Sequence, residues 1–228
     1  TILPDIKENV FDFGITTIFG NPIKITGMAG DQQSSLIGQA CLKKGMSKST
    51  YGTGCFMLMN IGNKPKYSKN KLLTSIAYII NGKVAYCLEG SIFTAGSAIQ
   101  WLRDNLKIIK SSKETSRLYI KADKEQKIYM VPAFTGLGAP YWNANARGAI
   151  FGINRNTGVF EIVKATIQSV CYQSKDLIKL MEKDSSIKIS QIRVDGGMIQ
   201  NSSFIQFLSD ILNIKIIVPK YSESTALG

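Results

Sequence analysis

The sequence Gln191-Ile-Arg-Val-Asp-Gly-Gly197 joins a predicted strand to a predicted helix through two adjacent glycines. Its first residues are typical of a short buried strand, and residues 202–212 repeat apolar side chains at helical spacing. A strand, a double glycine and a helix start let the backbone come close to a bound nucleotide. A glycine pair alone says little. With Asp195 before it and Asn201 shortly after it, the pattern favours a nucleotide site.

The rest of the chain places strands first in hairpins and later in alternation with helices. Asn81-Gly82 is a favoured centre for a type I′ hairpin turn. Predicted strands cover residues 23–28, 50–61 (a pair that turns at 52–54), 72–80, 83–89, 127–134, 191–194 and 214–218. Predicted helices cover residues 34–44, 96–109, 160–181 and 202–212. This order predicts an α/β fold with a mixed sheet flanked by helices.

The composition excludes several classes of protein. The 228 residues include four cysteines and no histidine, have a net charge of +12, and are 44% apolar, which is typical of a globular protein. No apolar run approaches the roughly 18 to 20 residues that span a bilayer, and the first residues lack the pattern of a leader. The lysines form no basic stripe with interleaved aromatics, and the cysteines lack metal or redox spacing. We expect a soluble, cytoplasmic protein with reduced thiols, no membrane span and no nucleic-acid function.

Gly30-Asp-Gln-Gln33 supplies a carboxylate and an amide beside the end of a predicted strand. Because the chain has no histidine, proton transfer near neutral pH falls to a carboxylate, a lysine, a tyrosine or a cysteine. Asp31 is a candidate general base for a substrate hydroxyl, and Gln32 a candidate for binding another hydroxyl of the same substrate. The alternative is a loop aspartate that caps the helix predicted from residue 34.

Two further glycine-containing segments are candidates for phosphate contacts. In Tyr51-Gly-Thr-Gly-Cys-Phe56, a hydroxyl lies between two glycines whose turn would bring backbone N–H groups to a phosphate. Gly96 begins a predicted helix, whose N-terminal N–H groups attract anions, and Gln100 lies one turn further on. The alternatives are a plain hairpin turn for the first segment and an ordinary helix start for the second.

A series of longer blocks resembles the glycerol kinases of the FGGY carbohydrate kinase family, which has an actin-like ATPase (ribonuclease H-like) fold. The blocks are Gly30-Asp-Gln-Gln33, Tyr51-Gly-Thr-Gly-Cys-Phe-Met-Leu-Met-Asn60, Gln100-Trp-Leu-Arg103, Pro132-Ala-Phe-Thr-Gly-Leu-Gly-Ala-Pro-Tyr-Trp142, Ala146-Arg-Gly-Ala-Ile-Phe-Gly152, Arg193-Val-Asp-Gly-Gly197 and Thr225-Ala-Leu-Gly228. They extend over nearly the whole chain. The resemblance implies ATP-dependent phosphorylation of glycerol to glycerol 3-phosphate.

The resemblance also implies a role for individual residues. Asp31 is similar to the catalytic base, Gln32 to a second glycerol contact, and Phe56 to the aromatic that packs on the glycerol carbons. The implied nucleotide contacts are Thr53 and Gly54 at the transferred phosphate, Gly96 and Gln100 on the phosphate and ribose side, and Gly197 and Asn201 beside the adenine. Mg²⁺ is expected to bridge the ATP phosphates, and no protein ligand to a metal is assigned.

The resemblance divides the chain at residue 38. Residues 1–38 resemble the tail of a first, substrate-side domain, and residues 39–228 a second, nucleotide-side domain cut short at its C-terminus. Since the first domain carries part of the cleft, we expect the missing N-terminal domain to be a required partner and this chain to be inactive alone. A nucleotide-binding remnant of a split or decaying gene, and a kinase for another polyol or sugar, are the alternatives. A homo-oligomer is possible.

Some positions depart from the family pattern. Asn143, Glu161 and Lys164 stand where an aspartate, a histidine and an arginine are usual. The segment 19–22 replaces a longer glycine-rich loop that many bacterial members use for allosteric control.

Overall fold

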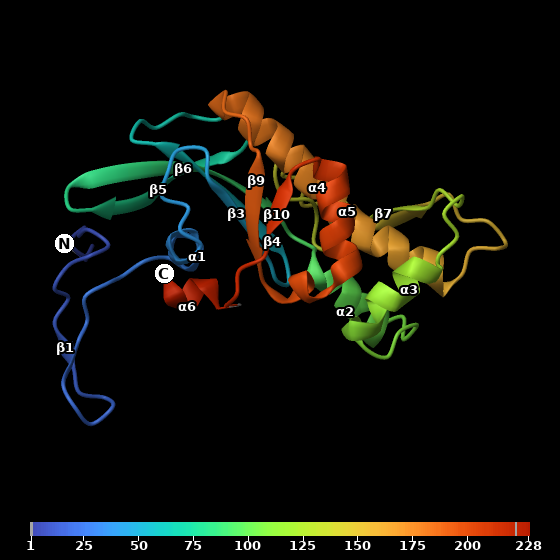
Figure 1. The fold of residues 1–228 in the computed structure, drawn as a ribbon, viewed down its shortest axis with the longest axis horizontal. Coiled ribbons are helices and arrows are strands. Elements are labelled where there is room, and N and C mark those ends of the chain that lie inside the picture. Colours follow the sequence, from blue (N-terminus) through green and yellow to red (C-terminus); the bar gives the residue numbers. More distant parts are fainter. Residues whose placement is uncertain (1, 222) are drawn as a thin grey trace.

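The computed structural model describes residues 2–221 and 223–228 and is built on a mixed sheet with helices on both faces (Figure 1). Its strands are β1 Ile15–Thr16, β2 Ile23–Lys24, β3 Ser47–Tyr51, β4 Cys55–Gly62, β5 Leu73–Ile80, β6 Lys83–Ile92, β7 Tyr129–Val131, β8 Ala149–Phe151, β9 Gln191–Asp195 and β10 Lys215–Ile217. Its helices are α1 Asp31–Gly38, α2 Gly96–Asp104, α3 Thr115–Lys121, α4 Val159–Ser185, α5 Ser202–Leu212 and α6 Ser224–Leu227, with 3₁₀ turns η1 Ser112–Glu114 and η2 Gly197–Gln200.

The main sheet has six strands in the order β10-β9-β3-β4-β6-β5. β10, β9 and β3 are parallel, whereas β3, β4, β6 and β5 pair antiparallel. The predicted hairpin at Asn81-Gly82 is confirmed, because β5 and β6 pair on either side of it and both turn residues have positive φ angles (51° and 71°). The mixed sheet predicted from the sequence is therefore present.

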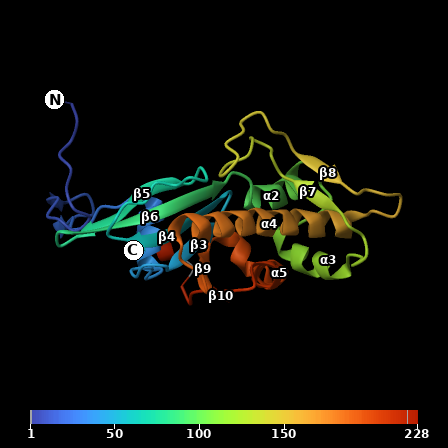
Figure 2. The same cartoon turned by 90° about the horizontal axis from the view of Figure 1, so that it is seen from above.

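The two faces of the sheet differ in what covers them. Because side chains alternate along a strand, Met57 and Met59 of β4 join the main core with α4, while Leu58 joins a smaller core with Leu36 of α1. Figure 2 shows α4 running along one side of the sheet, with α5 beside it. The face that carries α1 also buries Lys48 of β3, and we call it the polar face. The candidate acceptor residues lie on it.

Residues 2–30 form an extended segment outside this core (blue in Figure 1). It touches the β5–β6 hairpin, where the Asn9 N–H donates to the Ile79 carbonyl at 3.0 Å and the Gly82 N–H donates to the Glu8 carboxylate at 3.0 Å. Its large apolar side chains are mostly exposed. These exposed residues are Ile2, Leu3, Ile6, Val10, Phe11, Ile15, Ile18, Phe19, Ile23, Ile25 and Met28.

Helices α1 and α6 pack against each other, although they come from opposite ends of the sequence (Figure 1). The Ser34 hydroxyl of α1 donates to the carbonyl of Thr225 at 2.8 Å. A side chain at Gly38 would collide with the backbone of Ser224, so the close contact requires glycine there. Segments 191 residues apart in the sequence thus lie side by side.

Several predicted boundaries were wrong. The strand expected over residues 23–28 is only two residues long, and the helix expected over 34–44 begins at Asp31 and ends at Gly38. Asp31 therefore starts a helix instead of ending a strand, because extended Gly30 takes the N-cap position. Residues 110–126, for which no helix is predicted, contain η1 and α3, and a capping box between Ser111 and Glu114 begins them. Among the described residues, no helix is long and apolar enough to cross a membrane.

Burial raises the thiol pKa of Cys41 to about 11 and those of Cys55 and Cys87 to about 12, and it raises that of Cys171 further. The unfolded chain releases these protons near pH 9, before the folded chain does, so stability falls as pH rises from 9 to 11, by up to about 1.4 kcal/mol per pH unit for each thiol. Burial lowers the pKa of Lys48 to about 8, so this group alone would make stability rise with pH. The four thiols together outweigh this single lysine.

We therefore expect the free energy of unfolding, measured with urea, to be clearly lower at pH 10.5 than at pH 8.5. The decline should be shallower in Cys171→Ala, which lacks one of these thiols. Stability that is constant or increasing over this range would contradict the burial of the thiols.

Candidate nucleotide-binding and active site

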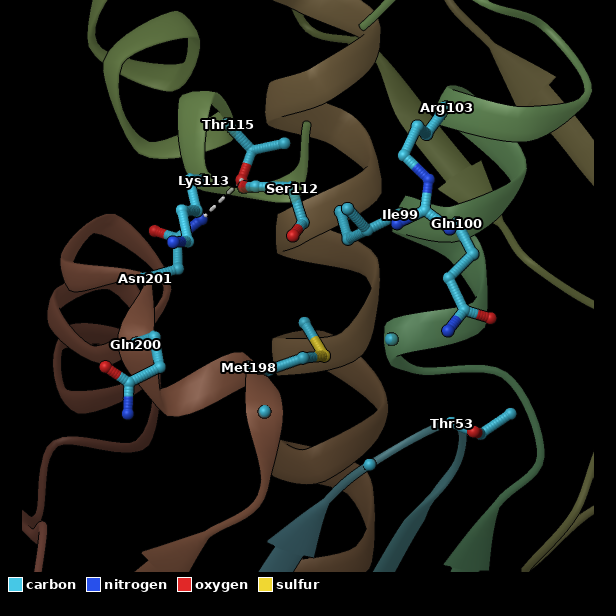
Figure 3. Close-up of a pocket in the computed structure, with 13 residues that line it drawn as sticks. Thr53, Ile99, Gln100, Arg103, Ser112, Lys113, Thr115, Met198, Gln200 and Asn201 are labelled. Carbon is cyan, nitrogen blue, oxygen red and sulfur yellow. Dashed lines mark hydrogen bonds between the residues drawn. The ribbon is translucent and has the colours of Figure 1, made fainter. Parts of the chain in front are cut away.

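A cavity of about 560 Å³ opens at the end of β3 (Figure 3). Its volume lies within the roughly 300–1,000 Å³ typical of small-molecule sites. Four segments form its walls: the β3–β4 turn, α2, the start of α3 with η1, and η2 with the start of α5. The lining residues are Gly52, Thr53, Gly96, Ile99, Gln100, Arg103, Ser112, Lys113, Thr115, Gly197, Met198, Gln200 and Asn201.

The side chain of Tyr51, at the end of β3, anchors the β3–β4 turn. This fully buried side chain donates its hydroxyl to Ser174 of α4 at 3.0 Å and packs edge-on against Phe204 of α5. The next residues, Gly52 to Gly54, therefore enter the cavity from a rigid base. Thr53 is exposed, and no described residue accepts a hydrogen bond from the backbone N–H groups of Thr53 or Gly54. These are open donors of the kind that bind phosphate oxygens.

The start of α2 differs from the expectation in one respect. The N–H groups of Gly96 and Ser97 donate to the carbonyls of Gly52 and Thr53 at 2.9 and 3.1 Å. They fasten the helix to the β3–β4 turn and are not free to bind an anion. Gly96 is still essential to this geometry, because a side-chain carbon there would lie 2.5 Å from the Gly52 carbonyl oxygen. Gln100, one turn later, is exposed at the cavity wall, as Figure 3 shows.

The two glycines after β9 have different roles. Gly196 has a φ angle of 91°, and a side chain there would collide with the backbone of Tyr51, so only glycine fits. Gly197 has no positive φ, and nothing lies within 4 Å of the position of an added side-chain carbon. Its missing side chain therefore leaves open space at the cavity.

Asn201 is fixed by two hydrogen bonds. Its side-chain oxygen accepts from the Phe204 N–H at 3.0 Å and so caps α5, while its side-chain amide donates to the hydroxyl of buried Thr115 at 2.8 Å. The second bond joins the walls formed by α3 and α5 and is the dashed line in Figure 3. Since the amide has two hydrogens, one donor remains available for a ligand.

The predicted acceptor-side residues lie on the α1 face of the sheet. Asp31 is exposed at the start of α1, and its carboxylate accepts from the Gln32 backbone N–H at 2.8 Å and from the Gln32 side-chain amide at 3.3 Å. Phe56 is 37% exposed and pairs with Thr50 across β3 and β4, so both point to the same face. Lys48 of β3 lies on that face as well and donates to the Gln32 side chain. The structure thus gathers Asp31, Gln32 and Phe56 on one face beside β3.

The sequence over residues 47–228 matches the C-terminal domain of the FGGY family of carbohydrate kinases. The chain belongs to that family. It is 53% identical over 230 residues to Glycerol kinase 1 of Pseudomonas aeruginosa, covering 100% of this chain and 46% of the relative. The predicted resemblance, and its limitation to a C-terminal part, are confirmed.

Solved FGGY structures share the fold. A Plasmodium falciparum glycerol kinase with ADP superposes with a TM-score of 0.90 at 43% identity, covering 99% of this chain and 46% of that one. A ligand-bound xylulose kinase from Lactobacillus acidophilus gives a TM-score of 0.76 at 24% identity and covers 90% of this chain and 41% of that one, which shows the fold alone. The predicted actin-like α/β class is confirmed. The chain spans about half the length of these relatives.

Within this FGGY domain, the cavity gathers most of the predicted nucleotide contacts. Thr53, Gly96, Gln100, Gly197 and Asn201 all line it. Gly54 does not, and it lies against β6, where a side chain would meet the Ile92 carbonyl oxygen at 2.7 Å. Packing against β6 therefore explains why residue 54 is a glycine. Its backbone N–H is the group that could bind a phosphate.

Sequence reasoning missed other residues of the cavity wall. Met198 follows the glycine pair directly, and Ser112, Lys113 and Thr115 come from the capping-box segment. The Ser-x-x-Glu spacing at Ser111 was a usable signal for a helix start, but nothing local places that helix beside η2. Lys113 makes no ion pair among the described residues, whereas Arg103 is held by Asp104 at 2.6 Å. Among the described cations of the cavity wall, Lys113 is therefore the one without an ion-pair partner.

Proposed function

We propose that the complete enzyme phosphorylates glycerol with ATP, and that this chain forms the nucleotide side of its active site. The observation that carries the proposal is the position of β3. On its polar face, Lys48 and Thr50 lie beside the acceptor-side residues, and at its end the turn at Gly52 enters the cavity. An acceptor hydroxyl and a terminal phosphate would thus meet along one strand.

The reaction requires a base, a positioned hydroxyl and a stabilised phosphoryl group. Asp31 takes the proton of the glycerol hydroxyl while that oxygen bonds to the terminal phosphorus of ATP and the bond to ADP breaks. Gln32 holds a second hydroxyl, and Phe56 packs on the glycerol carbons. Thr53 and the open N–H groups of its turn bind the transferred phosphate. Gln100, Gly197 and Asn201 hold the nucleoside end.

The residues of the cavity fit a nucleotide and a cation carried on it. The cavity has open space beside Gly197, and the N–H groups at Thr53 and Gly54 suit phosphate oxygens. The described residues contain no cluster of three or more metal-binding side chains. Mg²⁺ commonly binds through substrate phosphates and so would be carried into the cavity on the nucleotide. When bound, Mg²⁺ would neutralise phosphate charge.

We infer that the apolar segment 2–30 belongs to the tail of an N-terminal substrate-side domain, with the division between the two domains near residue 38. Its exposed isoleucines and phenylalanines form the kind of surface that another domain covers. The relatives have additional chain of the length that such a domain needs, since this sequence spans 46% of the Pseudomonas aeruginosa protein. A cytoplasmic location fits an ATP-dependent kinase with four buried free thiols.

Calorimetric titration of the purified chain with Mg-ATP tests the nucleotide half by itself. We expect saturable binding of one nucleotide, because the cavity walls all come from this chain. A folded sample that takes up no ATP would contradict the assignment of the cavity.

A chimera tests the complete reaction. In it, this chain replaces the 230 aligned residues of the Pseudomonas aeruginosa relative, which supplies the rest of the enzyme. We expect formation of glycerol 3-phosphate, and no turnover by the chain alone. ATP binding without turnover in a folded chimera would favour a nucleotide-binding remnant. Higher activity with a larger polyol than with glycerol would favour another sugar kinase.

A further inference from the structure

Lys48 is a fully buried lysine on the polar face of β3. Its ammonium nitrogen lies 2.5 Å from the side-chain oxygen of Gln32 and 3.0 Å from the hydroxyl of Thr50. It forms no ion pair with any described carboxylate. A buried cation that is bonded only to neutral oxygens is destabilised by desolvation, so its position is not explained by stability.

The charged and titratable groups that face Lys48 come from each element packed around it. They are the carboxylates of Asp195 on β9, Asp31 on α1 and Glu89 on β6, the thiols of Cys41, Cys55 and Cys87, and the cation Arg193, which is paired with Lys48 between β9 and β3. Burial lowers the pKa of Lys48 to about 8, and the nearby Asp195 opposes that shift. Burial likewise raises the pKa of Glu89. Lys48 is therefore mainly charged at pH 7 and loses its charge slightly above it.

The bond from Lys48 determines how the Gln32 amide is oriented. An ammonium group only donates, so it must face the oxygen of the amide, and the NH₂ group must face the other way. That NH₂ group lies 3.3 Å from the Asp31 carboxylate. One of its two hydrogens serves Asp31, and the other is available for a ligand. The site then presents an acceptor and a donor side by side.

We propose that Lys48 is a positioning residue of the acceptor site, which fixes the Gln32 amide so that Asp31 and Gln32 recognise two neighbouring hydroxyl groups of one substrate. This inference rests on the proposed function and adds a residue to it. A hydroxyl that loses its proton to Asp31 is bound on one side, and the oxygen of the next hydroxyl accepts from Gln32. The substrate class is a vicinal diol.

The same network extends toward the nucleotide side. Thr50, which accepts from Lys48, lies 3.3 Å from the hydroxyl of Ser35, and that hydroxyl donates to Asp195 at 3.1 Å. Asp195 directly precedes Gly196 and Gly197. Lys48 is thus bonded on one side to the acceptor pair and connected on the other to the strand that leads into the cavity.

The contact can be tested in the isolated chain by NMR. With ¹³C-labelled glutamine, we expect the side-chain carbonyl signal of Gln32, assigned by its loss in Gln32→Leu, to shift between pH 6.5 and 9.5 with a midpoint near 8. The shift should be absent in Lys48→Met, which keeps the length of the side chain without its charge, and retained in the surface control Lys83→Met. A signal that does not move in folded wild-type protein would overturn the proposal without any variant.

The consequence for recognition can be tested in the chimera. Lys48→Met should raise KM for glycerol at least tenfold and leave KM for ATP within twofold, whereas Lys83→Met should change neither. The increase in KM caused by Lys48→Met should be smaller for an acceptor with a single hydroxyl, because such an acceptor has no second hydroxyl for Gln32 to bind. An unchanged KM for glycerol would overturn the proposal. Inactivity of the wild-type chimera would count against the proposed function. In that case the NMR signal of Gln32 would still test whether Lys48 contacts the Gln32 amide.

Discussion

Replacing Asp31 by asparagine in the chimera should lower kcat for glycerol phosphorylation by roughly 10²- to 10⁴-fold, the range that general bases contribute. The asparagine keeps the size of the side chain but cannot accept the proton of the attacking hydroxyl. Because Asp31 is exposed and outside the cavity wall, KM for ATP should stay within twofold. Steady-state kinetics with both substrates varied measures the two effects separately.

The control for this prediction is Asp210→Asn. Asp210 is an exposed aspartate on α5 that accepts a hydrogen bond from Gln206 at 2.8 Å, so its replacement also removes one surface charge and weakens one bond. It should leave kcat unchanged. If Asp31→Asn kept more than a tenth of the wild-type kcat, another group would have to be the base.

Gly197→Leu should weaken ATP binding by the isolated chain at least a hundredfold without unfolding it. Nothing in the protein lies within 4 Å of an added Cβ, and the φ angle is not in the left-handed region, so the backbone at this position accepts a side chain. It fills the space of the cavity that we assign to the nucleotide, and a ligand cannot overlap it. Calorimetry measures the affinity, and thermal unfolding shows whether the chain is intact.

Two other glycines serve as comparisons. Gly27→Leu places the same side chain on the exposed N-terminal segment, where the nearest atom is 3.8 Å away, and should change neither binding nor stability. Gly96→Ala forces a carbon to within 2.5 Å of the Gly52 carbonyl and should lose stability together with binding. Wild-type ATP affinity in a folded Gly197→Leu protein would show that the nucleotide binds elsewhere.

Local sequence signals identified the parts of the structure that are determined by neighbouring residues. The hairpin at Asn81-Gly82 and the strand, glycine pair and helix around Gly196 follow from backbone preferences that only a few residues set. Helix α5 matched its predicted bounds, because its apolar spacing and its Asn201 cap are both visible in the sequence. The family blocks added roles for Asp31 and Phe56 that spacing alone left open.

Contacts between distant segments were not predictable in this way. The donors at the start of α2 looked free in the sequence, but they bond to carbonyls more than forty residues earlier, at Gly52 and Thr53. No local pattern distinguishes Lys48 from the other lysines, and its burial follows from the packing of α1 beside β3. Thr115 lines the cavity and accepts from the Asn201 amide, a residue 86 positions later in the sequence. In each case tertiary packing, which no local pattern encodes, determines the role.

The structure also explains three departures from the family pattern. The Asn143 oxygen accepts from the N–H groups of residues 145 and 146, as an aspartate oxygen would. Glu161 accepts from the backbone N–H of Gly158, which precedes α4, and from the Asp123 N–H, so it serves to begin α4. Lys164 donates to the Asp123 carbonyl at 2.9 Å. All three residues have local structural partners that suit their chemistry.

The contact between α1 and α6 ties together segments that lie 191 residues apart in the sequence, since the Ser34 hydroxyl donates to the Thr225 carbonyl. Helix α1 carries Asp31 and Gln32 at its start. The position of these two residues therefore depends on a helix from the other end of the sequence, and a change confined to residues 224–227 would be felt on the acceptor side of the site.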